Sequence, residues 1–175
     1  ILVINKRVKL IVGCSSSNTL EASKFALKLS KKKIDYLLVL TPYYLKTNNE
    51  GVIKHFNEIA NKSKVPIIIY HVPSRTGQYI DKCVIKELSK HKNIIGIKEA
   101  SGDLSYIDSI KEYLSDDFIL LSGNDDLLIE TLKKGGSGII SVLSNVYPEV
   151  SIKTYNLCLN NKYKEASEYY KKYID

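Results

Sequence analysis

A lysine stands at the carboxyl end of a short apolar segment, Ile94–Lys98, with the sequence IIGIK. Such a segment is typical of a buried strand, where an ammonium group loses hydration and the neutral, nucleophilic amine is favoured. A neutral lysine amine can attack a ketone and form a Schiff base. Lys98 is therefore a candidate covalent nucleophile. The alternative is a strand-end lysine whose alkyl stem lies on apolar surface while its ammonium reaches solvent.

Polar and aromatic residues follow the other apolar segments in a similar way. These residues are Tyr43, Tyr44, Tyr70, His71, Ser74, Arg75, Glu99, Gly123, Asn124, Asp125, Ile140 and Ser141. In a parallel α/β fold the carboxyl ends of all strands point to one face, and that face carries the active site. We therefore expect a lysine, an arginine and tyrosines to converge there, which favours the Schiff-base interpretation of Lys98. Individually, the tyrosines could be core or interface aromatics and Arg75 a surface charge.

The elements that would position these residues alternate between apolar strands and amphipathic helices. The sequence predicts strands at 9–13, 36–40, 65–70, 94–98, 118–122 and 138–142, and helices at 19–32, 50–62, 81–90, 104–114, 127–134, 148–159 and 162–173. Strands that are continuously rich in Ile, Leu and Val are typical of parallel sheets buried on both faces. An open doubly wound sheet and part of a (β/α)₈ barrel both fit this pattern. The turn after the first strand, Gly13–Ser17, is not a GxGxxG dinucleotide fingerprint.

The length of the chain matters for the barrel interpretation. A complete barrel needs about 250 residues and eight strands, whereas this chain has 175 residues and six predicted strands. The sequence also contains no methionine, so we expect a fragment or a processed product. We predict a partial barrel over residues 1–147 and C-terminal helices over residues 148–175.

Composition narrows the classes of function. The formal net charge is +7, with 26 Lys and Arg against 19 Asp and Glu. Most lysines fall in predicted helices, which indicates solvated faces rather than nucleic-acid binding, and a positive field also suits small anionic substrates. No apolar run is long enough to cross a bilayer, and residues 1–13 lack the basic start and long apolar run that are typical of a secretory signal. Cys14, Cys83 and Cys158 show neither metal spacing nor a disulfide framework, so we expect a cytoplasmic protein without a metal site.

Five motifs together resemble the dihydrodipicolinate synthase family of class I, pyruvate-dependent aldolases. They are TPYY at 41–44, YHVPSRTG at 70–77, GIKEASGDL at 96–104, SGND at 122–125 and GGSGIISV at 135–142. They occur in the family's order and spacing and extend over nearly the whole chain. The resemblance implies a (β/α)₈ barrel and the condensation of pyruvate with aspartate 4-semialdehyde in lysine and diaminopimelate biosynthesis.

The resemblance also implies roles for individual residues. The lysine of the GIKEA motif, Lys98, would form the Schiff base with pyruvate, so that no separate cofactor is needed. Tyr70 and Tyr44 would relay protons, with Tyr44 reaching into a neighbouring subunit's site in a homotetramer, a dimer of dimers. Arg75 would bind the carboxylate of the aldehyde with its two-pronged guanidinium. Gly123 and Ile140 would line the pyruvate pocket.

Several positions depart from the family's pattern. Glu21 and Tyr43 match the family's allosteric lysine site, but Ser17 replaces its asparagine, so feedback inhibition by lysine does not follow. His71 replaces the usual asparagine and should be a packing or hydrogen-bonding residue, while Asn124 replaces an aspartate. We expect Glu99 to pair with a neighbouring cation, and His55 and His91 to lie on the surface.

Other functions remain open. N-acetylneuraminate lyase shares the lysine and tyrosine, although the VPSRTG loop with Arg75 favours the synthase. The family's third relay residue, a threonine in a GTTGE motif, is absent from this sequence. The chain could therefore be an inactive remnant that only binds pyruvate or assembles with partners. We expect the isolated chain to be poorly active or poorly stable, because an unclosed barrel leaves sheet edges unpaired.

Overall fold

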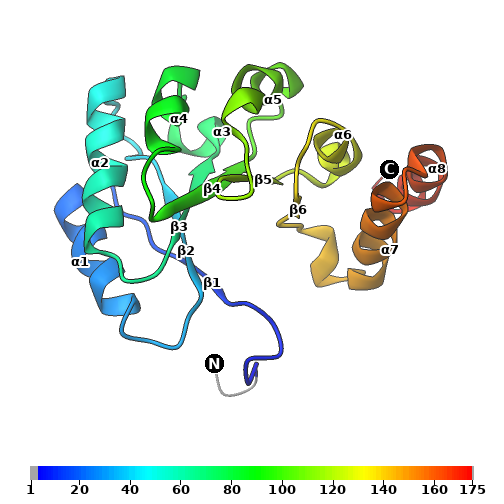
Figure 1. Ribbon diagram of the computed structural model, residues 1–175, viewed down its shortest axis with the longest axis horizontal. Helices are drawn as coiled ribbons and strands as arrows, with labels where there is room; N and C mark the ends of the chain where they lie inside the picture. Colours follow the sequence, from blue (N-terminus) through cyan, green and yellow to red (C-terminus); the bar gives the residue numbers. More distant parts are fainter. Residues whose placement is uncertain (1–3, 175) are drawn as a thin grey trace.

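Six parallel strands form one sheet in the computed structural model, which describes residues 4–174 (Figure 1). The strands are β1 (Ile11–Gly13), β2 (Tyr36–Leu40), β3 (Ile67–His71), β4 (Ile94–Glu99), β5 (Ile119–Ser122) and β6 (Gly138–Ile139). They pair in sequence order, each strand with the next. A doubly wound sheet reverses its strand order at a switch point. The unbroken order confirms the interpretation as a partial (β/α)₈ barrel.

The helices that connect the strands lie along one side of the curved sheet, and two further helices follow β6. They are α1 (Thr19–Leu29), α2 (Asn49–Lys62), α3 (Pro73–Thr76), α4 (Lys82–Leu88), α5 (Leu104–Ile110), α6 (Leu128–Lys133), α7 (Pro148–Leu159) and α8 (Tyr163–Ile174). Three short 3₁₀ segments are η1 (Lys111–Tyr113), η2 (Asp125–Leu127) and η3 (Leu143–Asn145). Figure 1 shows α1, α2, α4 and α5 in an arc outside the strands, with α7 and α8 beyond α6 at the far end. The described chain is thus an open part of a barrel wall.

Local sequence signals explain where several helices begin and end. The side chain of Asn18 accepts a hydrogen bond from the N–H of Glu21 and starts α1, and Asn48 does the same for α2 through the N–H of Gly51. Pro148 stands in the first turn of α7, where its missing N–H costs no helical hydrogen bond. Gly77 ends α3 with a φ of 70°, a left-handed conformation that favours glycine.

The main core lies between the sheet and these helices. On β3, Ile67 and Ile69 face this core, and so do Leu37 and Val39 of β2 and Phe56 of α2. Burying each such side chain stabilises the fold by about 1.5–3 kcal/mol. Intervening residues on the strands point to the other, inner face of the sheet, which is the face a closed barrel would enclose. The alternation therefore separates structural residues from those available to a site.

A second cluster joins the C-terminal helices to α6. Leu128 of α6, Val150 and Cys158 of α7, and Ala166 and Tyr170 of α8 are buried together. Within residues 4–174 no helix is long and apolar enough to cross a membrane. The division at residue 147 remains a prediction, and its outermost residues, 1–3 and 175, lie outside the described part.

Three expectations need correction. The last strand is predicted at 138–142, but β6 has only two residues. Ile140 still donates to the carbonyl oxygen of Ser122, and the chain then turns so that the N–H groups of Val142 and Leu143 donate to the carboxylate of Asp125. The VPSRTG segment, predicted as a loop, contains the short helix α3. His55 was expected at the surface but is 1% exposed, because it lies on the same face of α2 as Val52 and Phe56.

Candidate active site

An irregularity in β4 places Lys98 on the inner face of the sheet. Ile67 of β3 pairs with Ile94, but Ile69 pairs with Ile97, so β4 contains one extra residue between the two pairs. Because side chains alternate along a strand, one extra residue exchanges the two faces for everything that follows. Ile94 and Ile97 consequently both face the helices, and Lys98 faces inward. Without the extra residue Lys98 would point into the helix-packed core.

Gly96 lies within this irregularity. A Cβ atom at position 96 would lie 2.3 Å from the carbonyl oxygen of Ile119 and 2.8 Å from its Cγ1 atom. Backbone atoms cannot move aside as a flexible side chain can, so only glycine fits against β5 here. Gly96 therefore supports the strand geometry that turns Lys98 inward.

Lys98 and Tyr70 face each other across neighbouring strands. They are paired residues of β4 and β3, and the Nζ atom of Lys98 lies 4.2 Å from the centroid of the Tyr70 ring. The residue Lys98 is 8% exposed. An ammonium held over an aromatic ring is attracted by the ring's negative face. The structure thus brings the predicted nucleophile and the predicted proton relay into direct contact.

The other side of the Lys98 stem is covered by Gly123. A Cβ atom at Gly123 would come within 2.9 Å of Lys98 Cε and within 2.5 Å of the Ala100 side chain. The N–H of Gly123 donates a hydrogen bond of 2.6 Å to the carbonyl oxygen of Glu99. The glycine is therefore required for close packing against the lysine, while its role in lining a pyruvate pocket stays a prediction. Ile140 follows β6, and its N–H donates to the carbonyl oxygen of Ser122, one residue before Gly123.

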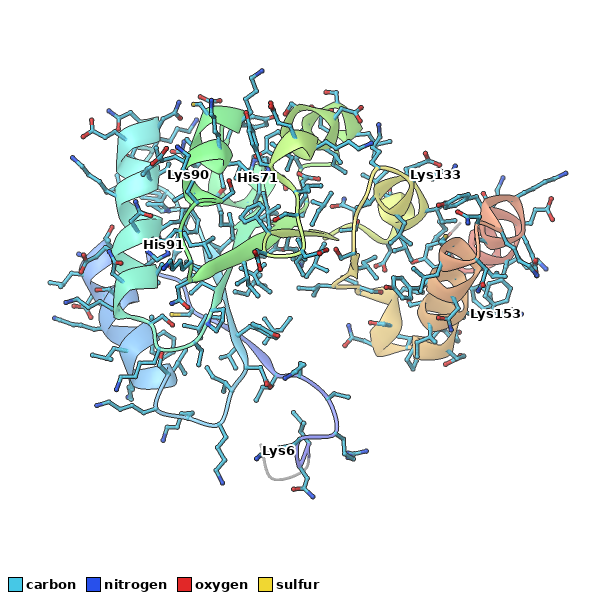
Figure 2. All side chains as sticks on the ribbon, viewed as in Figure 1. Lys6, His71, Lys90, His91, Lys133 and Lys153 are labelled. Carbon is cyan, nitrogen blue, oxygen red and sulfur yellow. The ribbon has the colours of Figure 1, made fainter. Side chains whose placement is uncertain are left out.

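A buried histidine and glutamate lie behind this pair of residues, on the helix-covered side of the sheet. His71 and Glu99 are the next paired residues of β3 and β4, and both are at most 2% exposed. His71 is labelled in Figure 2. The Nδ1 atom of His71 is 3.3 Å from Oε1 of Glu99 without forming a hydrogen bond. Glu99 also accepts a 2.6 Å hydrogen bond from the N–H of Ser101, which holds the turn after Lys98.

Aromatic rings surround His71. The ring centroids of Tyr106 and Tyr79 lie 4.5 Å and 5.0 Å from that of His71. Burial raises the pKa of the Tyr106 hydroxyl above its ordinary value, and the neighbouring Tyr79 and Glu99 raise it further. The expected packing role of His71 is confirmed. Glu99 was expected to pair with a neighbouring cation, and the side chain that lies beside it is the His71 ring.

The remaining predicted residues lie on loops and helices around the carboxyl ends of the strands. Tyr44 is 91% exposed and has a φ of 71°, a left-handed conformation that is uncommon for a side chain of this size. Tyr43 is 37% exposed, and Arg75 is an exposed residue of α3, at the same edge of the sheet as Lys98. Glu21 is paired with Lys24 on the surface of α1. The described contacts do not join these four residues to Lys98.

Two polar residues, His55 and Asp125, have many contacts, although sequence reasoning gave them no specific role. His55 accepts a hydrogen bond from the Thr19 hydroxyl at Nδ1 and donates one from Nε2 to the carbonyl oxygen of Leu40, at the end of β2. Burial lowers the pKa of His55 to about 4, so this ring is neutral near pH 7. The helical spacing of His55 from Val52 already indicates in the sequence that this histidine lies on the buried face of α2. Asp125 accepts hydrogen bonds from residues that are distant in the sequence, and no local sequence pattern predicts such contacts.

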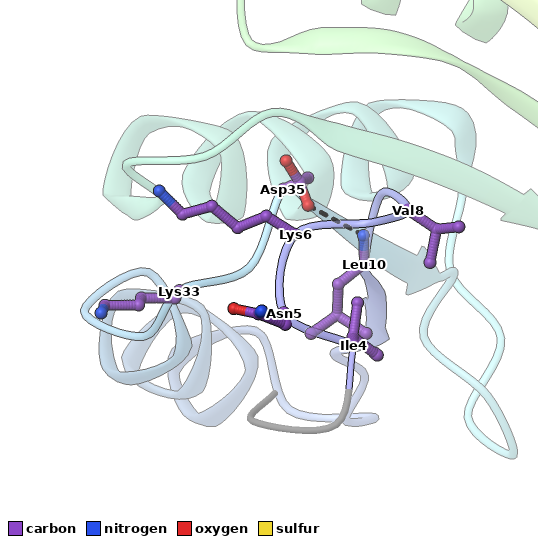
Figure 3. A pocket seen from close by; sticks show the side chains of 7 residues that line it. All are labelled: Ile4, Asn5, Lys6, Val8, Leu10, Lys33 and Asp35. Carbon is purple, nitrogen blue, oxygen red and sulfur yellow. Dashed lines mark hydrogen bonds between the residues drawn. The ribbon is translucent and has the colours of Figure 1, made fainter.

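A small pocket of about 120 Å³ lies elsewhere in the molecule (Figure 3). It is lined by Ile4, Asn5, Lys6, Val8, Leu10, Lys33 and Asp35, and the N–H of Leu10 donates to Asp35. Both Leu10 and Asp35 precede strands, so this pocket lies at the amino ends of β1 and β2, away from the edge that carries Lys98. Among residues 4–174, no group of His, Cys, Asp and Glu side chains is arranged to hold a metal ion.

The arrangement can support amine chemistry on a small carbonyl compound. Lys98 is sheltered between an aromatic ring and a glycine, and a tyrosine hydroxyl on the adjacent strand can move protons. An exposed guanidinium on the same edge can bind a carboxylate. These are the components of a Schiff-base site for an anionic substrate.

Comparisons with known proteins agree with this geometry. The Dihydrodipicolinate synthetase family profile matches residues 2–175. A 4-hydroxy-tetrahydrodipicolinate synthase of Methanospirillum hungatei is 44% identical over 168 residues, which are 95% of this chain and 57% of that protein. A protein of the same name from Buchnera aphidicola is 41% identical, over 93% of this chain and 55% of its own length. The chain thus spans little more than half the length of the curated relatives it matches.

Solved structures give the same result. The 4-hydroxy-tetrahydrodipicolinate synthase of Methylacidiphilum fumariolicum SolV superposes with a TM-score of 0.92 at 34% identity, covering 97% of this chain and 57% of that one. The chloride-inhibited dihydrodipicolinate synthase of Acinetobacter baumannii, determined in complex with pyruvate, has a TM-score of 0.93 at 31% identity and covers 98% of this chain and 59% of its own.

Proposed function

Because the chain belongs to the dihydrodipicolinate synthetase family, we propose that Lys98 forms a Schiff base with pyruvate for condensation with aspartate 4-semialdehyde. The product would be 4-hydroxy-tetrahydrodipicolinate, an intermediate of lysine and diaminopimelate biosynthesis in the cytoplasm. The observation that carries the proposal is the position of Lys98, sheltered on the inner face of the sheet with its Nζ atom over the Tyr70 ring.

The first step would make the substrate a carbon nucleophile. The neutral amine of Lys98 attacks C2 of pyruvate, and the resulting carbinolamine loses water to give an iminium ion. The iminium draws electrons from the neighbouring methyl group, so a methyl proton leaves and an enamine forms. Tyr70 would carry these protons, and the contact of its ring with the Lys98 Nζ atom supports this role.

The second step would form the carbon–carbon bond. The enamine carbon attacks the aldehyde of aspartate 4-semialdehyde, whose oxygen becomes a hydroxyl by accepting a proton. The amino group of the same substrate then attacks the iminium carbon, which closes the ring and expels the amine of Lys98. Arg75, exposed at this edge of the sheet, would bind the semialdehyde carboxylate through two parallel hydrogen bonds.

Tyr44 fits this proposal only within an assembly. At 91% exposure its side chain lies outside any site that the described chain forms alone. We propose that it completes the proton relay in a neighbouring subunit of a homo-oligomer, a dimer of dimers. The exposed Leu45 beside it is consistent with a covered surface, because it is 71% exposed in the single chain.

Reductive trapping tests the proposed function. The chain is incubated with pyruvate and borohydride, which reduces an iminium to a stable amine, and its intact mass is measured. A single adduct with the mass of reduced pyruvate is expected, and a Lys98→Arg variant, which keeps the charge, should give none. A folded parent chain that gains no adduct would refute the proposal.

Addition of an aldehyde before the borohydride separates the alternatives, because only the unreduced Schiff base can react. Aspartate 4-semialdehyde should discharge the Schiff base of a synthase and lower the amount of trapped adduct, whereas discharge by N-acetylmannosamine would indicate the N-acetylneuraminate lyase type. A Schiff base that neither aldehyde discharges would indicate a chain that binds pyruvate without turning it over. This outcome is relevant because the chain covers little more than half the length of its relatives.

A further inference from the structure

The carboxylate of Asp125 gathers four hydrogen-bond donors from two distant parts of the chain. Asp125 begins η2, two residues after Gly123. Its Oδ2 atom accepts from the N–H groups of Val142 and Leu143, at 2.9 and 3.0 Å. Its Oδ1 atom accepts from the Ser141 hydroxyl and, at 3.3 Å, from the hydroxyl of Tyr170. These donors are 16 to 45 positions away in the sequence.

These bonds fix the turn that follows β6. The Ser141 hydroxyl also accepts a 2.8 Å hydrogen bond from the N–H of Ser144, so the carboxylate and the turn form a closed network. Ile140, the residue before Ser141, is joined to β5 through the carbonyl oxygen of Ser122. Asp125 therefore holds the Ile140 segment at a set distance from the Gly123 segment, which packs against Lys98.

The fourth donor connects this turn to the last helix. Tyr170 is 1% exposed in the cluster formed by α6, α7 and α8. Burial raises the pKa of its hydroxyl, as does the charge of Asp125, so the hydroxyl keeps its proton and acts as a donor near neutral pH. Tyr170 is buried and Asp125 is half-buried, so this contact orients both partners, because a buried hydroxyl left without an acceptor loses hydration without compensation.

We propose that Asp125 is a positioning residue for the pyruvate end of the site, and that Tyr170 makes α8 part of the support of that site. The inference rests on the proposed function, since it assumes that pyruvate lies between the Gly123 and Ile140 segments. An asparagine at 125 has one acceptor oxygen and an amide NH₂, which cannot accept from a second pair of donors. In the Asp125→Asn variant, one of the two pairs of hydrogen bonds that residue 125 accepts is therefore lost, and the turn after β6 is held less firmly.

Pyruvate titration with borohydride trapping measures the effect. The half-saturating pyruvate concentration and the maximal adduct are determined for the parent, Asp125→Asn and Tyr170→Phe. Asp126→Asn is the matched control, because Asp126 is the adjacent acid and is exposed. Displacing a substrate-positioning segment should raise the half-saturating concentration by about ten- to a hundredfold for Asp125→Asn, and by less for Tyr170→Phe. The control should match the parent, and saturating pyruvate should restore the full adduct.

Thermal unfolding, followed by circular dichroism, separates positioning from stability. A merely structural role would lower the maximal adduct in proportion to the folded fraction and leave the half-saturating concentration unchanged, which would overturn the inference. If Asp125→Asn does not fold, the half-saturating pyruvate concentration of Tyr170→Phe still tests the inference, because this variant loses one hydrogen-bond donor to Asp125 and retains the aromatic ring. A parent without any adduct would refute the proposed function itself, whereas a parent and variants with equal half-saturating concentrations would refute only this inference.

Discussion

The Nζ atom of Lys98 lies 4.2 Å from the centroid of the Tyr70 ring. The contact exists because one extra residue in β4 turns Lys98 to the inner face of the sheet, where Tyr70 already points. The tyrosine thus has two separable properties, a ring that holds the amine and a hydroxyl that could carry protons.

Replacing Tyr70 by phenylalanine separates these properties. The variant keeps the ring beneath Lys98 and removes the hydroxyl, so the free energy of unfolding should change by less than about 1 kcal/mol. Loss of proton transfer should slow deuterium exchange into the pyruvate methyl group by about 100-fold or more, as measured by NMR. Tyr70→Leu, which also removes the ring contact, is the companion variant. Unchanged exchange in Tyr70→Phe would exclude Tyr70 from the relay.

Gly96 is predicted to be intolerant of even a methyl group. Gly96→Ala would place a Cβ atom 2.3 Å from the carbonyl oxygen of Ile119, and such overpacking should lower the free energy of unfolding by about 1–3 kcal/mol. Pyruvate trapping should fall as well, because β4 must shift. Gly13→Ala is the matched control, since no atom lies within 4 Å of its added Cβ. Chemical denaturation checks both variants, and equal stability would contradict the packing argument.

The sequence predicted the strands but not the side of the sheet on which Lys98 lies. Continuous apolar runs such as IIGIK identify a buried strand, yet they carry no alternation that would assign its two faces. The orientation comes from the close approach of Gly96 to Ile119, which is a tertiary contact. The links made by Asp125 also depend on tertiary structure. His55 is different, because its spacing from Val52 and Phe56 already placed it on the buried face of α2.

Buried His55 predicts a pH-dependent stability. Its pKa is about 4 in the folded chain, because burial disfavours the charged ring, against an ordinary value of 6.5. The unfolded chain therefore takes up a proton at a higher pH than the folded chain. The free energy of unfolding should be greatest above pH 6.5 and decline by up to about 3 kcal/mol as the pH falls toward 4.

Chemical denaturation at a series of pH values measures this decline. His55→Gln should remove most of the dependence attributable to this ring, at the cost of some stability from the contacts with Thr19 and Leu40. His91→Gln, at a partly exposed position, should retain the decline of the parent. Parallel pH profiles for the parent and His55→Gln would show that another group is responsible.

Arg75 is predicted to act on the aldehyde and not on pyruvate. Arg75→Ala removes an exposed guanidinium from α3, so pyruvate trapping and the free energy of unfolding should stay near the parent values. Loss of a charge-assisted, two-bond contact with the semialdehyde carboxylate should slow discharge of the unreduced Schiff base by about 10- to 100-fold at a fixed aldehyde concentration, as measured by adding borohydride at a series of times. Arg75→Lys should recover only part of the rate, because an ammonium cannot reproduce the two-pronged geometry. Equal discharge rates would assign carboxylate binding to another residue.

Lys98 alone among the lysines of this chain is expected to form the Schiff base. Peptide mapping after trapping with pyruvate and borohydride identifies the lysine that reacts. One modified residue, Lys98, is expected within the peptide that contains GIKEASGDL. Adducts on surface lysines such as Lys46 or Lys153, with Lys98 unmodified in a folded sample, would refute this assignment.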